Sequence, residues 1–374
     1  MRFTIKREEL LKGLNTANRA VANKVNVAIL QNVKLELNEE GLFITGSNYD
    51  ITIKTQIPYR FNGEEIIRNF KEGSILLEAK LLTEIVRKTE SDEMTIDVVD
   101  STAVITNSSN RSTFELVGIK AEEYPDIDLQ SSGTTLSLSK QEFNSLVSQT
   151  AFAASLKERM PILTAINLEA QNGVLTAKAT DSARMAKKDM PVPEDLKFVA
   201  NVPAKVMIEV DHLMENQPSV QMSFSDKKVL FVLGRTIVVS RLIAGDYPDT
   251  KNIIPKTVNY SLQVNANDFI KAVDRANILS IDRENVVDLT MNEETVKISA
   301  KSQQKGWAAE IIDVFKYHGS ELKMSFNSEY VVAAIKALNC EDVTFSFVAE
   351  MRPIVIKNAA DDSVVQIVTP VRTY

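Results

Sequence analysis

The residues of this chain that could support acid–base, nucleophilic or metal chemistry are few and scattered. Its two histidines, His212 and His318, have no second histidine, cysteine or carboxylate at metal-ligand spacing. Asp181 stands beside Ser182 as part of a nucleophilic pair would, but no histidine base accompanies them. Because short polar residues are common in turns, the sequence favours a turn here over a catalytic site.

Motifs that bind nucleotides or activate a serine are also missing. The sequence has no phosphate-binding loop, no Gly-x-Gly-x-x-Gly after a strand and no Gly-x-Ser-x-Gly elbow. The single cysteine, Cys340, excludes an intramolecular disulfide, and its neighbours Leu338 and Val343 indicate a buried structural position. We therefore expect no catalytic residue, no metal and no cofactor. An enzyme centred on Asp181 and Ser182 remains the alternative, and it would need a base that the sequence lacks.

Composition indicates an ordinary globular protein. The chain has 374 residues, of which 44% are hydrophobic and 25% charged, and its net charge is −7. It has no apolar run of about 18 residues and opens on an alternating strand where a signal peptide would stand. We expect a cytoplasmic protein that does not enter a membrane.

A strand followed by a helix occurs three times, and these elements must position any functional residues. The copies start at Phe3, Leu136 and Leu262, which are 133 and then 126 residues apart. Periods of roughly 20 to 50 residues indicate solenoids or propellers, whereas ~125 residues is the size of a domain with its own core. The repeat predicts three tandem domains of one fold.

Other landmarks keep the same register. The segment from Gly46 to Pro58 falls on the segment from Ala179 to Pro191, again 133 residues later. Tyr124-Pro125-Asp126 and Tyr247-Pro248-Asp249 close the first two copies. The third copy has no such tripeptide and ends in a hydrophobic tail, Val364 to Tyr374, so it is the most diverged of the three.

Within each copy the hydrophobic period switches between two and 3.6. Alternating stretches such as Val33–Leu37, Met94–Val98 and Val343–Phe347 predict strands with one buried face. Two short helices and many strands per copy indicate an α+β domain whose helices pack on the same sheet face. Helical spacing spans Glu8–Val21, Lys80–Lys88, Lys140–Ala151, Lys205–Met214, Ala266–Ile278 and Ser328–Leu338.

Several short motifs, taken in order, resemble one protein family. They are Met1-Arg2-Phe3-Thr4-Ile5 before a leucine-rich helix, Pro161-Ile162-Leu163-Thr164, Ala179 to Met185, Tyr247-Pro248-Asp249, Phe326-Asn327 with Tyr330, Ala337 to Cys340, and Val368 to Arg372. Together they resemble the bacterial DNA sliding clamp, the β subunit of DNA polymerase III. The resemblance covers the whole chain.

The resemblance implies three tandem DNA-clamp domains, over residues 1–127, 128–252 and 253–374, each with two helices packed on antiparallel sheets. Two chains would form a head-to-tail homodimer, a closed ring that encircles double-stranded DNA. The implied partners are the replicative DNA polymerase, the clamp loader and other proteins with clamp-binding motifs. A scaffold with three protein-binding modules and no DNA ligand remains an alternative.

The resemblance also implies a basic lining for the hole. A net charge of −7 fits a sliding protein, because a uniformly basic surface would bind phosphates too tightly to move. Contacts to phosphates alone would give no sequence specificity. The expected DNA-binding residues are Lys12, Arg19, Lys24, Lys80 and Lys205.

A pocket for short linear peptides, between the second and third domains, is the second implied site. Its expected residues are Leu163, Thr180, Ser182, Arg184, Met185, Pro248, Asn252, Ile253, Asn327, Tyr330, Met351, Ile367, Thr369, Pro370, Val371 and Arg372. Four residues depart from the family pattern, namely Ala183, Met160, Pro161 and Thr369, so we expect the preferred peptide to differ from that of other members.

The dimer junction is the third implied site. Phe114 and Leu116 should meet Ile278 and Leu279, and Glu310 is the acid left to pair with a base such as Arg111. Because few charges remain, we expect a junction that rests on apolar contact and dissociates with little dependence on salt.

Overall fold

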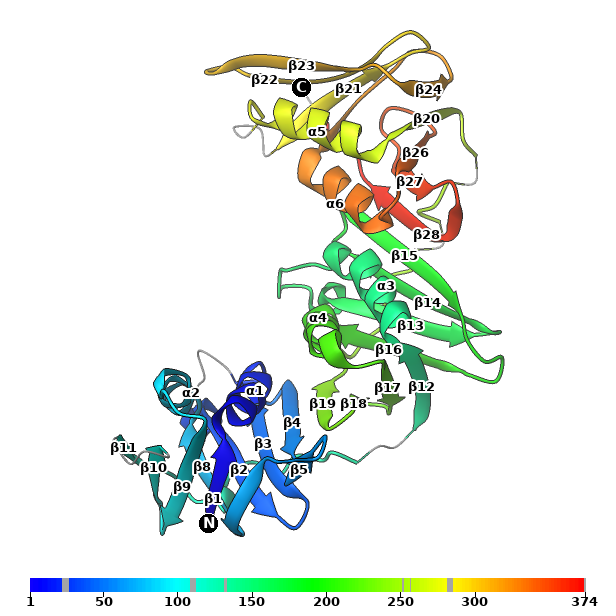
Figure 1. Cartoon of the computed structure of the whole chain (residues 1–374). Helices are drawn as coiled ribbons and strands as arrows, with labels where there is room; N and C mark the ends of the chain where they lie inside the picture. The colour runs from blue at the N-terminus through cyan, green and yellow to red at the C-terminus, as the bar shows by residue number, and fades with distance from the viewer. Residues whose placement is uncertain are drawn as a thin grey trace. The chain divides into compact units, whose positions relative to one another are not determined.

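The fold is that of a computed structural model of the chain (Figure 1). It describes residues 1–21, 27–107, 112–130, 133–250, 252–255, 257–280 and 285–372. Lys24, Arg111 and Tyr374 lie outside the described residues.

The predicted helices are confirmed to within a few residues. Among the described residues they are α1 (Arg7–Asn18), α2 (Ala79–Lys88), α3 (Lys140–Thr150), α4 (Ala204–Leu213), α5 (Ala266–Asn277) and α6 (Ser328–Leu338). The largest difference is at α1, which ends at Asn18 instead of Val21. There the N–H of Arg19 bonds to the carbonyl of Thr16 and that of Ala20 to Ala17, three residues back, so the last turn tightens and the helix stops.

Asparagine side chains begin both helices of the third copy. Asn265 accepts hydrogen bonds from the N–H groups of Asn267 and Asp268 at the start of α5, and Asn327 accepts from Tyr330 N–H at the start of α6. These bonds satisfy donors that have no partner within the helix. At its other end α6 stops at Asn339, which is in the left-handed region with φ 46°.

The chain divides into two compact units, and unit 1 (residues 1–141 and 209–242) holds two large antiparallel sheets. The five-stranded sheet runs β11 (Thr113–Val117), β10 (Thr102–Asn107), β9 (Glu93–Val99), β1 (Arg2–Lys6), β7 (Ile67–Lys71). The eight-stranded sheet runs β12 (Thr134–Ser139), β17 (Ser219–Phe224), β18 (Lys228–Leu233), β19 (Thr236–Arg241), β4 (Ile51–Ile57), β3 (Gly41–Ser47), β2 (Asn32–Asn38), β8 (Gly73–Glu78). A small hairpin pairs β5 (Arg60–Phe61) with β6 (Glu64–Glu65).

Unit 2 holds the other two antiparallel sheets. The nine-stranded sheet runs β16 (Phe198–Pro203), β13 (Ala165–Gln171), β14 (Val174–Thr180), β15 (Arg184–Pro191), β28 (Asp361–Val368), β27 (Ile354–Asn358), β26 (Asp342–Phe347), β20 (Tyr260–Asn265), β24 (Phe315–His318). The four-stranded sheet runs β23 (Gly306–Ile312), β22 (Val296–Ser302), β21 (Val286–Met291), β25 (Leu322–Asn327).

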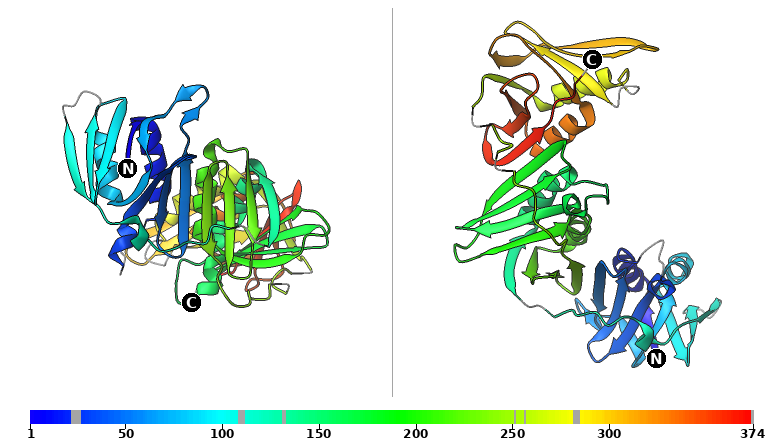
Figure 2. Two further views of the ribbon diagram at one scale, coloured as in Figure 1. Left: turned by 90° about the horizontal axis from the view of Figure 1, so that it is seen from below. Right: turned by 180° about the vertical axis from the view of Figure 1, so that it is seen from behind.

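Paired helices cover the sheets as the apolar spacing predicts. In unit 1, α1 and α2 lie side by side (Figures 1 and 2), and Leu10, Leu14 and Val86 share one core with Phe3 and Ile44 from the two sheets. In unit 2, α5 and α6 are in contact and bury a core of the same kind. Each helix is too short to be stable alone, so burial of its apolar stripe against a sheet holds it in place.

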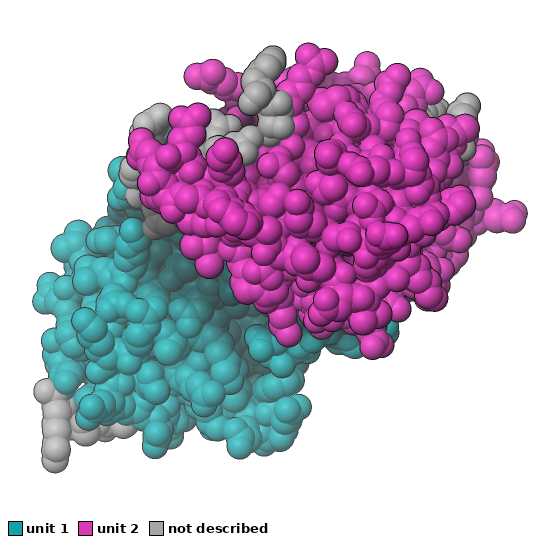
Figure 3. Space-filling view, turned by 90° about the horizontal axis from the view of Figure 1, so that it is seen from above, with its two compact units in different colours: residues 1–141, 209–242 teal, residues 142–208, 243–374 magenta. Residues whose placement is uncertain are grey.

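Contacts divide the chain into two compact units, 1–141 with 209–242 and 142–208 with 243–374 (Figure 3). This division cuts through the second copy of the repeat, because strand pairing crosses from one copy to the next. β4 of the first copy pairs with β19 of the second, and β15 of the second pairs with β28 of the third. Copies that are separate in sequence therefore share continuous sheets.

Candidate functional site

A cavity of about 370 Å³ in unit 2 collects many of the residues predicted for peptide binding. Four segments form it: residues 160–163 before β13, the turn between β14 and β15, the stretch after Tyr247, and the end of β28. Its lining is Met160, Leu163, Thr180, Ser182, Arg184, Met185, Pro248, Thr250, Ile253, Ile367 and Thr369. We call this the unit 2 pocket.

The β14–β15 turn is shaped by its own polar side chains. The Asp181 carboxylate accepts hydrogen bonds from the N–H groups of Ala183 (2.9 Å) and Arg184 (3.0 Å). The Thr180 hydroxyl donates to the Arg184 carbonyl at 2.6 Å, and Ser182 takes a positive φ of 77°. Asp181 and Ser182 thus have structural tasks in a turn, as the sequence favoured.

Arg184 is held rigidly at one wall. Its Nε donates to Asp181 Oδ2 at 3.0 Å, and both side chains are largely buried. The guanidinium carbon lies 4.5 Å from the ring centroid of Tyr330 and 5.6 Å from that of Phe152, a geometry that favours cation–π attraction. Tyr330, predicted for the site, thus contributes by packing on Arg184 and does not itself line the cavity.

Tyr247 helps to hold the β14–β15 turn in place. Its hydroxyl accepts a hydrogen bond from Thr180 N–H at 3.0 Å, and burial raises the pKa of Tyr247 to about 12. The sequence pointed to Tyr247 only as part of a repeated tripeptide. Met160 and Thr250 also line the cavity and were not predicted as site residues. The sequence pointed to Met160 only as a departure from the family pattern, and nothing in the local sequence distinguishes Thr250.

The C-terminal tail contributes less to the cavity than predicted. Ile367 and Thr369 line it, and Thr369 N–H donates to the Ala183 carbonyl at 2.9 Å. Val371 N–H instead bonds to the Ser325 carbonyl at 2.8 Å. The predicted residues that do not line the cavity are Asn252, Asn327, Tyr330, Met351, Pro370, Val371 and Arg372.

The described residues among those predicted for DNA binding lie on or beside helices, and two are paired with acids. Lys12 Nζ on α1 lies 2.9 Å from Glu9 and 3.0 Å from Glu8, and these hydrogen bonds raise the pKa of Lys12. Arg19 donates to Glu209 at 2.8 Å. The remaining described ones, Lys80 on α2 and Lys205 on α4, are exposed.

The described residues predicted for the dimer junction lie on two sheet edges and directly after α5, where Ile278 and Leu279 follow the helix. β11 and β23 each end a sheet, and among the described residues neither is paired on its outer side. Phe114 on β11 is 38% exposed, Trp307 on β23 is 72% exposed and Ile278 after α5 is 65% exposed. Exposed side chains of this size mark a surface that another molecule can cover.

Two of the predicted junction residues already have partners within the chain. Leu116 is 9% exposed and packs in the core of its own unit, so it offers less surface than Phe114. The Glu310 carboxylate accepts two hydrogen bonds from Arg275, at 2.6 and 2.9 Å, which lower the pKa of Glu310. Its pairing with Arg111 stays a prediction.

Within the described part of the chain, no group of three or more histidine, cysteine or acidic side chains is placed to hold a metal ion. No helix there is long and apolar enough to cross a membrane.

The sequence matches three family models of the DNA polymerase III beta subunit: the N-terminal domain over residues 1–128, the central domain over 137–249 and the C-terminal domain over 251–372. The beta sliding clamp of Bacillus subtilis (strain 168) is 33% identical over 379 residues and that of Staphylococcus aureus 32% over 378, each covering 100% of both chains.

Solved structures agree with these matches. The crystal structure of the DNA polymerase sliding clamp from Bacillus subtilis has a TM-score of 0.95 at 32% identity, and the beta chain of DNA polymerase III from Streptococcus pneumoniae has a TM-score of 0.95 at 31%. Each comparison covers 100% of both chains.

Proposed function

Because the chain belongs to the beta sliding clamp family, the β subunits of DNA polymerase III, we propose that it is a DNA polymerase processivity factor. Two chains associate head to tail into a ring around duplex DNA, and the ring tethers the replicative polymerase. The domains of each chain are 1–127, 128–252 and 253–374. The protein acts in the cytoplasm, at the nucleoid, without catalysis of its own.

The observation that carries the ring is the equivalence of the strand edges. Residues 51–55 of β4 pair with 236–240 of β19, and residues 184–188 of β15 pair with 364–368 of β28. The two junctions are related by offsets of 133 and 128 residues, so they are copies of one another. In the third copy, β23 takes the place that β4 and β15 have in the first and second copies. In the first copy, β11 takes the place that β19 and β28 have in the second and third.

Pairing β23 of one chain with β11 of another would make the same junction between chains. A head-to-tail contact generates a ring if its rotation closes, and closure covers both edges, which otherwise invite uncontrolled strand pairing. Phe114, Trp307 and Ile278 would then be buried together. Because the contact is mainly apolar, its strength should vary little with salt.

The equivalence fixes a register that can be tested by crosslinking. β11 takes the place of β19 and β23 that of β15, which puts Thr113 of one chain opposite Ala309 of the next. Paired residues of antiparallel strands lie about 4.5–5.5 Å apart between Cα atoms, which suits a disulfide. In a chain with Cys340 replaced by serine, T113C together with A309C should form covalent dimers on oxidation. T113C alone is the control, and failure of the double variant to crosslink would contradict the register.

DNA is held by phosphate contacts from the helices, with Lys12, Lys80 and Lys205 as the described residues that we propose for this role, together with Arg19. Lys24 joins them as a proposal outside the described residues. Binding through phosphates carries no sequence information, so the ring slides.

Topology is the decisive test. The protein, loaded by a clamp loader onto nicked circular DNA, should remain bound through gel filtration and be lost when the circle is cut once. A protein that stays on the cut DNA binds by ordinary affinity, and one that never stays on the circle is not a clamp. Either result would refute the ring.

The unit 2 pocket takes short linear peptides from the polymerase, the clamp loader and other partners. Its apolar residues, among them Leu163, Met185 and Ile367, suit hydrophobic anchors, and the fixed turn around Asp181 pre-organises one wall. Ile253 is 37% exposed, so I253D should abolish polymerase stimulation without unfolding the chain or breaking the ring. Unchanged stimulation by I253D would place the polymerase contact elsewhere.

A further inference from the structure

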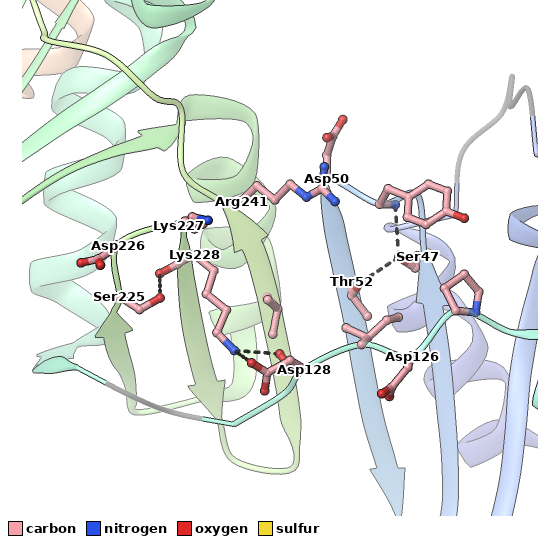
Figure 4. A pocket seen from close by; sticks show the side chains of 14 residues that line it. Ser47, Asp50, Thr52, Asp126, Asp128, Ser225, Asp226, Lys227, Lys228 and Arg241 are labelled. Atoms are coloured by element: carbon pink, nitrogen blue, oxygen red, sulfur yellow. Dashed lines mark hydrogen bonds and ion pairs between the residues drawn. The ribbon is translucent and has the colours of Figure 1, made fainter.

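A second cavity, of about 620 Å³, lies in unit 1 where β4 pairs with β19 (Figure 4). It is formed by the turn between β3 and β4, by residues 125–128, by the turn between β17 and β18, and by the end of β19. We call it the unit 1 cavity. It shares no residue with the unit 2 pocket.

The backbone of the unit 1 cavity repeats that of the unit 2 pocket. Arg241 N–H donates to the Asp50 carbonyl at 3.1 Å, as Thr369 N–H donates to the Ala183 carbonyl at 2.9 Å. These pairs differ by the offsets of 128 and 133 residues that relate the two strand junctions. Both cavities therefore sit at the same place in the repeat.

The turns at the two cavities are built alike. Asn48 Oδ1 accepts hydrogen bonds from the N–H groups of Asp50 (3.0 Å) and Ile51 (2.9 Å). Asp181, which lies 133 residues after Asn48, accepts the equivalent pair of bonds in its own turn. Tyr49 has a φ of 72° where Ser182 has 77°. A side chain seldom takes a positive φ unless its surroundings impose it, so the shared value is strong evidence of equivalence.

The supporting tyrosines correspond as well. Tyr124 precedes Pro125 as Tyr247 precedes Pro248, 123 residues later. Tyr124 is 8% exposed, and the contact of its hydroxyl with the Ser47 backbone is weaker than the 3.0 Å hydrogen bond of Tyr247. The tyrosine thus keeps its place in the first copy, although its contact with the turn is weaker.

The side chains that line the two cavities differ in chemistry. Thr52 and Arg241 of the unit 1 cavity stand where the unit 2 pocket has Met185 and Thr369. Val239 stands where the unit 2 pocket has Ile367, and it keeps an apolar floor together with Ile127. Charged groups surround this floor.

The charged side chains of the cavity that are left to meet a ligand carry a net negative charge. Lys228 Nζ donates to Asp128 Oδ2 (2.6 Å), to the Asp128 carbonyl (3.0 Å) and to the Gln130 carbonyl (3.1 Å), which uses all three of its protons. Of the other lining residues, Asp50, Asp126 and Asp226 carry negative charge, and the two cations are Lys227 and Arg241. Figure 4 shows Asp126 and Asp226 on either side of the Lys228–Asp128 pair.

We propose that the unit 1 cavity is a second peptide site, which takes a linear segment with an apolar anchor flanked by lysine or arginine. The anchor rests on Val239 and Ile127, and the flanking cations face Asp126 and Asp226. The proposal depends on the peptide-binding function of the unit 2 pocket, since it transfers that function to an equivalent place in the repeat. Charge separates the two sites, so each ring can hold two classes of partner at once.

The test is selection of short random peptides displayed on phage against the full-length protein, followed by affinity measurement with the enriched peptides. The cavity is disabled by the double substitution D126K and D226K, both at exposed positions. E39K, which reverses an exposed acid away from either cavity, is the matched control, and I253D disables the unit 2 pocket.

We expect one enriched class rich in lysine or arginine, whose affinity falls about tenfold in the double variant, as about 1.4 kcal/mol for two exposed charges implies. E39K and I253D should leave that class unchanged. If all enriched peptides are lost in I253D and none in the double variant, the unit 2 pocket binds peptides and the second site does not exist. If no peptide depends on either cavity, both proposals fail.

Discussion

Replacing Tyr247 by phenylalanine tests whether the hydroxyl under the unit 2 pocket holds the β14–β15 turn. Y247F deletes the acceptor for Thr180 N–H, a bond of 3.0 Å at a residue only 7% exposed. A buried donor left without a partner costs about 1–3 kcal/mol. Y124F makes the same change at the equivalent position, where the contact between the hydroxyl and the Ser47 backbone is weaker, so its cost should be smaller, under about 1 kcal/mol.

The pH dependence of stability, compared between the wild type and Y247F, gives a second expected magnitude. Burial raises the pKa of Tyr247 from 10 to about 12. Because the pKa is higher in the folded state, the protonated hydroxyl stabilises the fold fully below pH 10, and this contribution is lost as the pH rises through 12. The loss amounts to roughly 3 kcal/mol. Phenylalanine does not titrate, so the stability difference between the wild type and Y247F should narrow over this range.

Hydrogen exchange measured by mass spectrometry reports the effect locally. In Y247F, fragments that contain Thr180 should exchange about tenfold faster for each 1.4 kcal/mol lost, while Y124F should leave exchange near Ser47 nearly unchanged. Urea unfolding of both variants gives the accompanying loss of stability. Equal losses in Y247F and Y124F would refute the argument, because only Tyr247 makes a hydrogen bond of normal geometry to its turn.

Three further predictions concern DNA and assembly. K205A should reduce the magnitude of the negative slope of log affinity against log salt by about 0.9 on any duplex sequence, and a loss confined to particular sequences would contradict phosphate contact. E209Q frees Arg19 from its 2.8 Å partner, so the slope measured by the same titration should become steeper, and a shallower slope would show that the pair serves DNA binding as a unit. W307R places a charge on the exposed edge strand β23 and should shift sedimentation from dimer to monomer with unchanged circular dichroism. A W307R protein that stays dimeric would exclude this edge as the junction.

The sequence predicted elements better than it predicted pairings. Apolar spacing located the six helices of the described residues, because each buries one stripe on a sheet, as Leu10 and Leu14 do. The sequence showed a hydrophobic tail from Val364 to Tyr374. The pairing of Val364 and Val368 with Lys188 and Arg184 could not be predicted, because local hydrophobic pattern does not identify a partner far away in the chain.

For the candidate sites, the sequence located regions more reliably than individual side chains. Asn327 was predicted to bind peptide but caps α6, a role that its place directly before a helix could have revealed. Glu310 was predicted to face a second chain, and within its own chain it binds Arg275. Which partner a surface charge takes depends on the geometry of a folded hairpin beside a helix, and sequence spacing does not carry that information.

The strand junctions inside the chain differ from the proposed junction between chains in one respect. If β4 separates from β19, or β15 from β28, the connecting chain keeps the strands near each other at high effective concentration, so they rejoin quickly. No such connection holds β11 to β23 of a second chain. In a ring built from these junctions, the two junctions within each chain would re-form after opening, whereas the junctions between chains would not. A protein that pulls on the ring will therefore open it between the two chains.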